Sequence, residues 1–177
     1  MARAEAAGFP LSCEPEVGQL LAVLAAHLPA SCRVLELGTG AGVGTAWVVT
    51  GVGDRRDVTL VSVEQDADLA ALARQGSWPA WVHMLHRDAL DVLAESGGYH
   101  LIFADASGGK WEGLDRTIAA LAPGGLLVVD DMARQPWWDG EHSHQQERVR
   151  QTLLRHPSLL SVELNHGSGV ILSTRRS

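Results

Sequence analysis

Residues 34–45 read Val-Leu-Glu-Leu-Gly-Thr-Gly-Ala-Gly-Val-Gly-Thr, and this stretch decides the fold class. An apolar run that contains Glu36 is followed by glycines at alternate positions, Gly38, Gly40 and Gly42, and then by residues that can form a helix. Only glycine lets the backbone of such a turn pass close to a ligand, and the helix start offers free N–H groups. The stretch therefore predicts a strand, a tight turn and a helix that together form a nucleotide-type cofactor site.

The glycine spacing indicates which cofactor this turn binds. A dinucleotide fingerprint would place its third glycine at position 43, which is Val43, and a phosphate loop ending in Gly-Lys-Ser/Thr is absent from the sequence. An acid at Glu36 suits the sulfonium and amino acid head of S-adenosylmethionine and does not suit a pyrophosphate. The turn therefore favours S-adenosylmethionine over NAD, and over a plain strand-to-helix turn that binds no ligand.

Composition bounds the class of protein. The chain has 177 residues, of which 46% are hydrophobic, enough for one domain with a sizeable core. A formal net charge of −7 argues against a nucleic acid partner, which would need a basic face. The two cysteines, Cys13 and Cys32, have no zinc-type spacing and form no disulfide framework, so we expect a reducing, cytoplasmic location.

One apolar stretch, residues 20–28, could be mistaken for the core of a signal peptide. The segment before it carries Glu5, Glu14 and Glu16 rather than a basic cluster, so we reject that interpretation. No apolar run reaches the length of a transmembrane helix, and we expect no membrane partner.

Hydrophobic periodicity predicts alternating helices and strands. We expect residues 1–13 to be weakly structured and residues 14–177 to form a single domain. Helices are expected at 14–28, 43–50, 66–75, 88–95, 110–122 and 143–155, and strands at 33–37, 57–63, 81–85, 100–104, 126–129, 159–164 and 169–174. The pattern predicts an α/β fold with a doubly wound, mainly parallel seven-stranded sheet. Because no helix separates the last two strands, they are expected to form an antiparallel hairpin.

Acidic residues follow several of the expected strands. Glu64, Asp105 and the pair Asp130-Asp131 stand at the carboxyl ends of the second, fourth and fifth strands, and Asp88 closely follows the third. Ligands of such sheets bind beyond the carboxyl ends of the strands. We therefore expect these acids to line the functional site.

These motifs together resemble a known group of enzymes. They comprise Gly18-Gln19-Leu20-Leu21, the turn at residues 36–42, Glu64, Ala104-Asp105-Ala106 with Lys110, and Pro123-Gly124-Gly125 leading to Asp130-Asp131. In these features the chain resembles the class I S-adenosylmethionine-dependent methyltransferases, which have a Rossmann-like fold. More narrowly, it resembles the small cation-dependent O-methyltransferases, the group of the catechol and caffeoyl-CoA enzymes and their bacterial relatives.

The resemblance implies a set of cofactor contacts. Glu36 and the glycine turn would line the methionine end, Glu64 would bind both ribose hydroxyls through its two oxygens, and Asp88 would face the adenine amino group. The implied cofactor-binding residues are Glu36, Gly38, Thr39, Gly40, Gly42, Gly44, Thr45, Glu64, Gln65, Asp88, Ala89 and Asp105. The family often has a serine where this chain has Gly44.

The resemblance also implies a divalent cation and a base. Asp105, Asp130 and Asp131 would hold Mg²⁺ or Mn²⁺, and Lys110 would be the base, so that Lys110 and Asp105 are the implied catalytic residues. The family commonly has Asn at the third ligand position, and its lysine lies three residues after the aspartate rather than five. An alternative remains: Asp130-Asp131 is a polar end to a buried strand. Adjacent acids repel each other, and a cation would relieve this repulsion.

Aromatic and histidine residues beyond Asp131 offer weaker signals. Trp137 and Trp138 could line the side of a planar acceptor, or could pack in the core or an interface. His142 and His144 have a spacing seen in metal sites, but a solvated loop is the better interpretation. The remaining tryptophans are expected to pack.

From the sequence we expect a cytoplasmic S-adenosylmethionine-dependent O-methyltransferase that acts on a small aromatic hydroxyl compound with a divalent cation. Its partner is a small-molecule acceptor, and a homodimer is left open. The alternatives are a metal-independent O- or N-methyltransferase, an aminopropyl transferase and a cofactor-binding subunit without activity. The intact set of Asp105, Lys110 and Asp130-Asp131 argues against the last of these.

Overall fold

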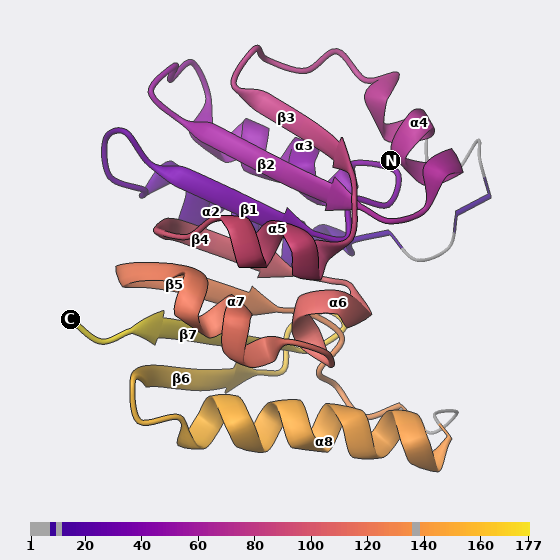
Figure 1. Cartoon of the computed structure of the whole chain (residues 1–177), viewed down its shortest axis with the longest axis vertical. Coiled ribbons are helices and arrows are strands. Elements are labelled where there is room, and N and C mark those ends of the chain that lie inside the picture. Colours follow the sequence, from indigo (N-terminus) through magenta and orange to yellow (C-terminus); the bar gives the residue numbers. More distant parts are fainter. Residues whose placement is uncertain (1–7, 10–11, 136–138) are drawn as a thin grey trace.

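A seven-stranded sheet forms the centre of the computed structural model, which describes residues 8–9, 12–135 and 139–177. Its strand order is β3-β2-β1-β4-β5-β7-β6 (Figure 1). The strands are β1 (Arg33–Leu37), β2 (Thr59–Glu64), β3 (Val82–His86), β4 (Tyr99–Ala104), β5 (Leu121–Val129), β6 (Leu159–Leu164) and β7 (Val170–Arg175). Strands β1 to β5 pair in parallel, and β7 is antiparallel to both β5 and β6. The predicted fold class, including the C-terminal hairpin, is confirmed.

Helices cover both faces of this sheet (Figure 1). They are α2 (Pro15–Ala26), α3 (Val43–Val52), α4 (Ala67–Arg74), α5 (Ala89–Glu95), α6 (Ser107–Lys110), α7 (Leu114–Ala120) and α8 (Gly140–Arg155). Within the described ranges, no helix combines the length and the apolar character needed to cross a membrane.

Alternation along the strands creates two separate cores. Val34 of β1 belongs to the cluster that packs against α2 and α3, whereas its neighbour Leu35 belongs to the cluster that packs against α5, α7 and α8. Successive side chains of a strand point to opposite faces, so each buried strand contributes to both clusters. The sheet is therefore packed between helices on both of its faces.

The helix expected at residues 110–122 is present as α7, but with narrower bounds than predicted. Residues 107–110 form the short helix α6, and α7 begins only at Leu114. Gly109 (φ 90°) and Gly113 (φ 74°) adopt left-handed backbone conformations that interrupt a continuous helix. Lys110 consequently lies at the end of a helix rather than at the start of one.

Two other boundaries differ from the sequence expectation. Strand β5 begins at Leu121 and includes Pro123-Gly124-Gly125, and the register of its pairing with β4 shifts between Tyr99 and Leu101. Helix α8 begins at Gly140, three residues before the expected start, because the Asp139 carboxylate accepts the His142 amide N–H at 2.7 Å.

Candidate active site

Two cavities lie side by side at the carboxyl edge of the parallel strands. The first, of about 280 Å³, is lined by the glycine turn, by Glu64 and Gln65 after β2, and by residues 105–108 after β4. The second, of about 470 Å³, lies between α6, α8 and Asp130-Asp131. Both cavities are lined by Ser12, Cys13, Asp105, Ala106 and Ser107. A molecule in one cavity would therefore adjoin a molecule in the other.

The glycine turn is fixed to the neighbouring strands. The amides of Gly38 and Thr39 both donate to the Val63 carbonyl, at 2.9 and 3.1 Å. Gly38 has a φ of 97°, and a Cβ at this position would lie 2.8 Å from the Asp105 carbonyl oxygen. The turn therefore requires glycine here both for its conformation and for its close approach to β4.

Glu36 is a buried carboxylate with one oxygen left unpaired. The side chain is 1% exposed, and its Oε2 accepts hydrogen bonds from the hydroxyls of Thr45 and Ser62. Its Oε1 has no hydrogen-bond partner among the described residues. Burial raises the pKa of Glu36 to about 7. A buried acceptor in the lining of a cavity fits a donor supplied by a ligand, such as the ammonium group of S-adenosylmethionine.

Gly44 makes room for this carboxylate. A Cβ at position 44 would lie 2.2 Å from Glu36 Oε1, closer than any real contact. The serine that the family often carries here is therefore incompatible with this orientation of Glu36. Ser62, which holds the other carboxylate oxygen, was not identified from the sequence.

Glu64 lies at the end of β2 and lines the first cavity. Its Oε2 accepts the Gly40 amide N–H at 2.8 Å and its Oε1 accepts that of Asp66 at 2.9 Å. Each carboxylate oxygen can accept a second hydrogen bond, so the residue remains suited to a vicinal diol. Gln65 and Ala89 line the same cavity.

Three predicted cofactor residues have other roles in the structure. The Asp88 carboxylate accepts the Leu90 amide N–H at 2.7 Å and caps α5, Gly42 precedes α3, and the Thr45 hydroxyl donates to Glu36. Among the described residues, these three do not line either cavity. Their contacts with a cofactor stay predictions.

Extension of the sheet hydrogen bonds brings the predicted ligand residues together. The Asp105 amide donates to Leu37 O at 2.9 Å, and the Asp130 amide donates to Ala104 O at 3.2 Å. One carboxylate oxygen each of Asp105, Asp130 and Asp131 lies within 4.8 Å of the others. The parallel ladder thus continues one residue beyond each strand and concentrates three acids at one edge.

The electrostatics of this cluster favour a bound positive charge. Burial, and then the charge of Asp130, raises the pKa of Asp105 well above its usual range. Burial also raises the pKa of Asp130 to about 6, although the Ser168 hydroxyl donates to this carboxylate. A purely oxygen donor set is the one that Mg²⁺ and Mn²⁺ prefer, so these residues fit the cation that the resemblance implies.

Lys110 joins the cluster in spite of its unusual spacing from Asp105. Gly108 and Gly109, which separate Asp105 from Lys110, have non-helical dihedral angles. The Lys110 ammonium nitrogen lies 3.3 Å from the Asp130 carbonyl oxygen and 3.5 Å from Asp131 Oδ2. The side chain is buried and lines the second cavity, as the role of a base would require.

Helix α8 forms the far side of the second cavity. The expectation of a solvated loop around His142 and His144 is wrong, because both residues lie on α8. The His142 ring packs edge-on against Trp111, with ring centroids 4.8 Å apart, and His144 is exposed. Trp137 and Trp138 lie outside the described residues, so their predicted contact with the acceptor stays a prediction.

Residues outside the motifs also line the two cavities and were not identified from the sequence. Phe9, Ser12 and Cys13 line the first cavity, although residues 1–13 carry no periodic signal. Cys13 is buried, and this burial raises the pKa of its thiol. Gln146 of α8 lines the second cavity. A signal for it existed, because a polar residue at position 146 interrupts the apolar stripe that Val149 and Leu153 continue.

Residues 35–132, more than half of the chain, match the model of the family described as "Methyltransferase domain". The chain belongs to this methyltransferase domain family. The resemblance to the class I methyltransferases is thereby confirmed at the level of the family and the fold.

Individual relatives agree with this assignment. The chain is 32% identical over 123 residues to "Putative O-methyltransferase" from Mycolicibacterium vanbaalenii, covering 65% of this chain and 53% of that protein. The chain thus spans about half the length of the curated relatives it matches. Cofactor-bound Rv0187 from MTB superposes with a TM-score of 0.82 at 26% identity, covering 99% of this chain and 87% of that one. An O-methyltransferase from Bacillus cereus in complex with SAH shares the fold, with a TM-score of 0.84, 19% identity and the same coverage.

The matched methyltransferase domain contains the glycine turn, Glu64, Lys110 and all three aspartates of the cluster. Cys13 precedes it, and α8 with His142 and Gln146 follows it. The motif residues of both cavities therefore belong to the family model, whereas part of the lining of each cavity lies outside it.

Proposed function

We propose that this chain is an S-adenosylmethionine-dependent O-methyltransferase that uses a divalent cation and acts on a small aromatic hydroxyl compound. One observation carries the proposal: a cavity with an unpaired buried carboxylate adjoins a cavity with three clustered aspartates and a buried lysine. The cofactor-bound and SAH-bound relatives of the same fold support the choice of methyl donor.

The first cavity suits the donor at two points. Glu36 Oε1 would accept the ammonium group of the methionine part, and Glu64 would accept the two ribose hydroxyls. The left-handed turn at Gly38 leaves room for the ligand beside the backbone. Asp105, which lines both cavities, marks the boundary at which donor and acceptor would meet.

The second cavity suits an acceptor with adjacent hydroxyl oxygens. A divalent cation held by Asp105, Asp130 and Asp131 would supply Lewis acidity that lowers the pKa of an acceptor hydroxyl. Lys110, buried beside the cluster, would take the hydroxyl proton. S-adenosylmethionine held by Glu36 and Glu64 would supply an electrophilic methyl group, which would pass to the acceptor oxygen with the electron pair of the carbon–sulfur bond left on a neutral thioether. Positioning of the two reactants in adjoining cavities would further lower the activation barrier.

Trp111 lines the second cavity together with the aspartate cluster. This aromatic side chain supports a planar acceptor. We include a cytoplasmic location in the proposal, because the free and buried Cys13 and Cys32 fit a reducing compartment.

The test begins with calorimetric titration of S-adenosylmethionine, SAH and NAD against the protein. Catechols, flavonoids and CoA-linked phenols are then assayed for methyl transfer with Mg²⁺, with Mn²⁺ and with excess chelator. We expect binding of the first two ligands, no binding of NAD, and turnover that the chelator abolishes. Full activity in excess chelator would favour the metal-independent alternative. In that case the ion pair of Lys110 with Asp131 would offset part of the negative charge of the aspartate cluster. Failure to bind either sulfur ligand would reject the proposal.

A further inference from the structure

Helix α8 carries polar residues on its buried side. Gln146 is 1% exposed and Arg150, one helical turn later, is 8% exposed. They lie on the same face of the helix as a consequence of their spacing by four. Val149 and Leu153, on the neighbouring positions, pack in the core between α8 and the sheet. Buried amide and guanidinium groups destabilise a fold unless they are hydrogen-bonded, so their partners identify what they do.

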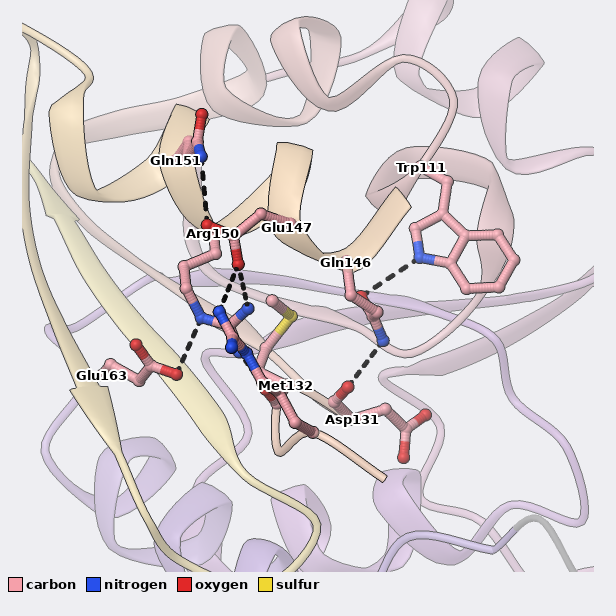
Figure 2. Close-up of polar contacts among 9 residues, drawn as sticks. Trp111, Asp131, Met132, Gln146, Glu147, Arg150, Gln151 and Glu163 are labelled. Carbon is pink, nitrogen blue, oxygen red and sulfur yellow. Dashed lines mark hydrogen bonds and ion pairs between the residues drawn. The ribbon is translucent and has the colours of Figure 1, made fainter. Parts of the chain in front are cut away.

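Both side chains bind the backbone just beyond β5 (Figure 2). The Gln146 amide Nε2 donates to the Asp131 carbonyl oxygen at 2.6 Å. The Arg150 guanidinium donates to the next carbonyl, that of Met132, and also to the carboxylates of Glu147 and Glu163. Two consecutive carbonyls are therefore held by two side chains of a single helix.

Asp131 requires such support. Its φ is 58°, a left-handed conformation that non-glycine residues adopt uncommonly and that aspartate tolerates better than most. Its side chain is 52% exposed, and within the described residues the carboxylate has one partner, Lys110, at 3.5 Å. The backbone conformation of Asp131 sets the direction of its Cα–Cβ bond and therefore which rotamers bring the carboxylate to the cluster. Gln146 holds that backbone at its carbonyl.

The other end of the Gln146 amide binds the segment that carries Lys110. Gln146 Oε1 accepts the indole N–H of Trp111 at 3.2 Å, and Trp111 directly follows Lys110 in the chain. One amide group thus joins the α6 segment to the end of β5 (Figure 2). These are the two segments that carry Lys110 and Asp131.

We propose that Gln146 is a positioning residue, which fixes the Asp131 carboxylate toward the cation and sets its distance from Lys110. The part of this inference that concerns the cation rests on the proposed function. A side chain behind the ligands that orients them is worth about 10–100-fold in metal affinity in other proteins. Gln146 stands in that relation to Asp131 through the backbone carbonyl.

The test compares three variants by titration of Mn²⁺ into the purified protein. Gln146→Met conserves the volume and removes both hydrogen bonds, and we expect Mn²⁺ affinity about 10–100-fold below wild type. Trp111→Phe removes only the second hydrogen bond, and we expect less than about a threefold change in Mn²⁺ affinity. Gln151→Met is the matched control: Gln151 is an exposed glutamine of α8 whose amide donates to Glu147 at 3.0 Å, and its replacement should leave Mn²⁺ affinity unchanged.

Further measurements separate positioning from a general effect on folding. SAH affinity should stay unchanged in all three variants, and in Gln146→Met a high Mn²⁺ concentration should restore kcat while the KM of the donor is unaltered. Mn²⁺ affinity within about twofold of wild type in Gln146→Met would overturn the proposal, as would an equal loss of SAH affinity. If the wild-type protein binds no Mn²⁺, the proposed cation site is rejected. Hydrogen exchange then tests the positioning role of Gln146 by itself. Faster exchange of the Asp131 amide in Gln146→Met than in Gln151→Met would then support it, and equal exchange would overturn it.

Discussion

The two cavities are built in different ways. The largest single share of the lining of the first comes from one short run of sequence, Glu36 to Gly44, and the rest comes from the N-terminal segment and the residues around the ends of β2, β3 and β4. The second is assembled from the N-terminal segment, α6, the end of β5, α8 and the loop before β7. The first is consequently visible as a motif, whereas the second exists only after the chain has folded.

Their charges differ as well. The first cavity holds one fully buried carboxylate, Glu36, whose second oxygen lacks a partner among the described residues. The second holds three aspartates opposed by Lys110. We infer that the first is built for a cationic organic group and the second for an inorganic cation. Variants in one cavity should therefore leave ligand binding in the other nearly intact.

The largest effect that would sharpen this contrast is expected for Asp130→Ala. The residue is 3% exposed at the centre of the cluster, so its loss should lower kcat/KM by about 100-fold or more at limiting Mg²⁺. Excess Mn²⁺ should partly restore turnover, and SAH affinity by calorimetry should stay within a factor of two to three of wild type, about 0.5 kcal/mol. Asp91→Ala, an exposed acid on α5, is the control. A collapse of SAH affinity would break the separation of the two cavities.

A second substitution tests whether a change in the first cavity weakens SAH binding and leaves Mn²⁺ binding in the second cavity unchanged. Glu64→Ala should weaken SAH binding by about 1–3 kcal/mol, the range for losing hydrogen bonds to a charged group. Mn²⁺ affinity should not change. Because Glu64 also accepts the Gly40 and Asp66 amides, Glu64→Gln serves as the milder comparison. SAH affinity equal to wild type in Glu64→Ala would remove the ribose assignment.

The pH dependence of SAH binding should report on Glu36. Burial raises its pKa from 4.5 to about 7, so near pH 6 the ligand-free protein holds a proton that binding of an ammonium group would release. Affinity should therefore rise with pH up to about 7 and then level off. By the same linkage, the free energy of unfolding of the ligand-free protein should fall as pH rises from 4.5 through about 7.

Glu36→Gln should flatten both pH profiles, measured by calorimetry and by denaturant titration at several pH values. Thr45 and Ser62 can still donate to the amide oxygen in this variant, which keeps the local structure comparable. An unchanged pH dependence of SAH affinity in Glu36→Gln would assign the proton to another group.

The smallest effect is expected for Ser168→Ala. The Ser168 hydroxyl donates to the Asp130 carboxylate from the loop before β7, and its loss should weaken Mn²⁺ binding about two- to fivefold, the equivalent of one modest hydrogen bond. Ser158→Ala, which removes a hydroxyl bonded to His156 at 2.9 Å, should have no effect on Mn²⁺ affinity. A weaker affinity in both variants would point to a general loss of stability.

The fold and the first cavity could be predicted because their signals are local. Alternating helices and strands define the doubly wound sheet, and the spacing of Gly38, Gly40 and Gly42 defines the turn. The helix expected at 110–122 begins later than predicted because hydrophobic periodicity does not report the sign of φ: Gly113 takes a positive φ inside the expected range, and α7 begins after it. Pro123-Gly124-Gly125 similarly signals an end, yet β5 runs through it.

The lining of the second cavity could be predicted only in part. Asp105 and Asp130 were found because the carboxyl ends of adjacent parallel strands meet at one edge. Cys13 and Gln146 contact this edge from segments that are distant in sequence: Cys13 has no local motif, and the interrupted apolar stripe at Gln146 marks a buried polar residue without showing what it contacts. Only the packing of α8 against the end of β5 shows which polar residue of that helix faces the cluster.

The space around Gly44 has a consequence for how this site can evolve. Since a Cβ there would lie 2.2 Å from Glu36 Oε1 and 3.0 Å from Phe103 Cε1, a side chain at position 44 requires the carboxylate to move. Gly44→Ser should be damaging in the present background and less damaging once Glu36 has been shortened to aspartate. The same substitution would thus differ in its fitness effect according to the residue at position 36, which makes the order of the two mutations decisive.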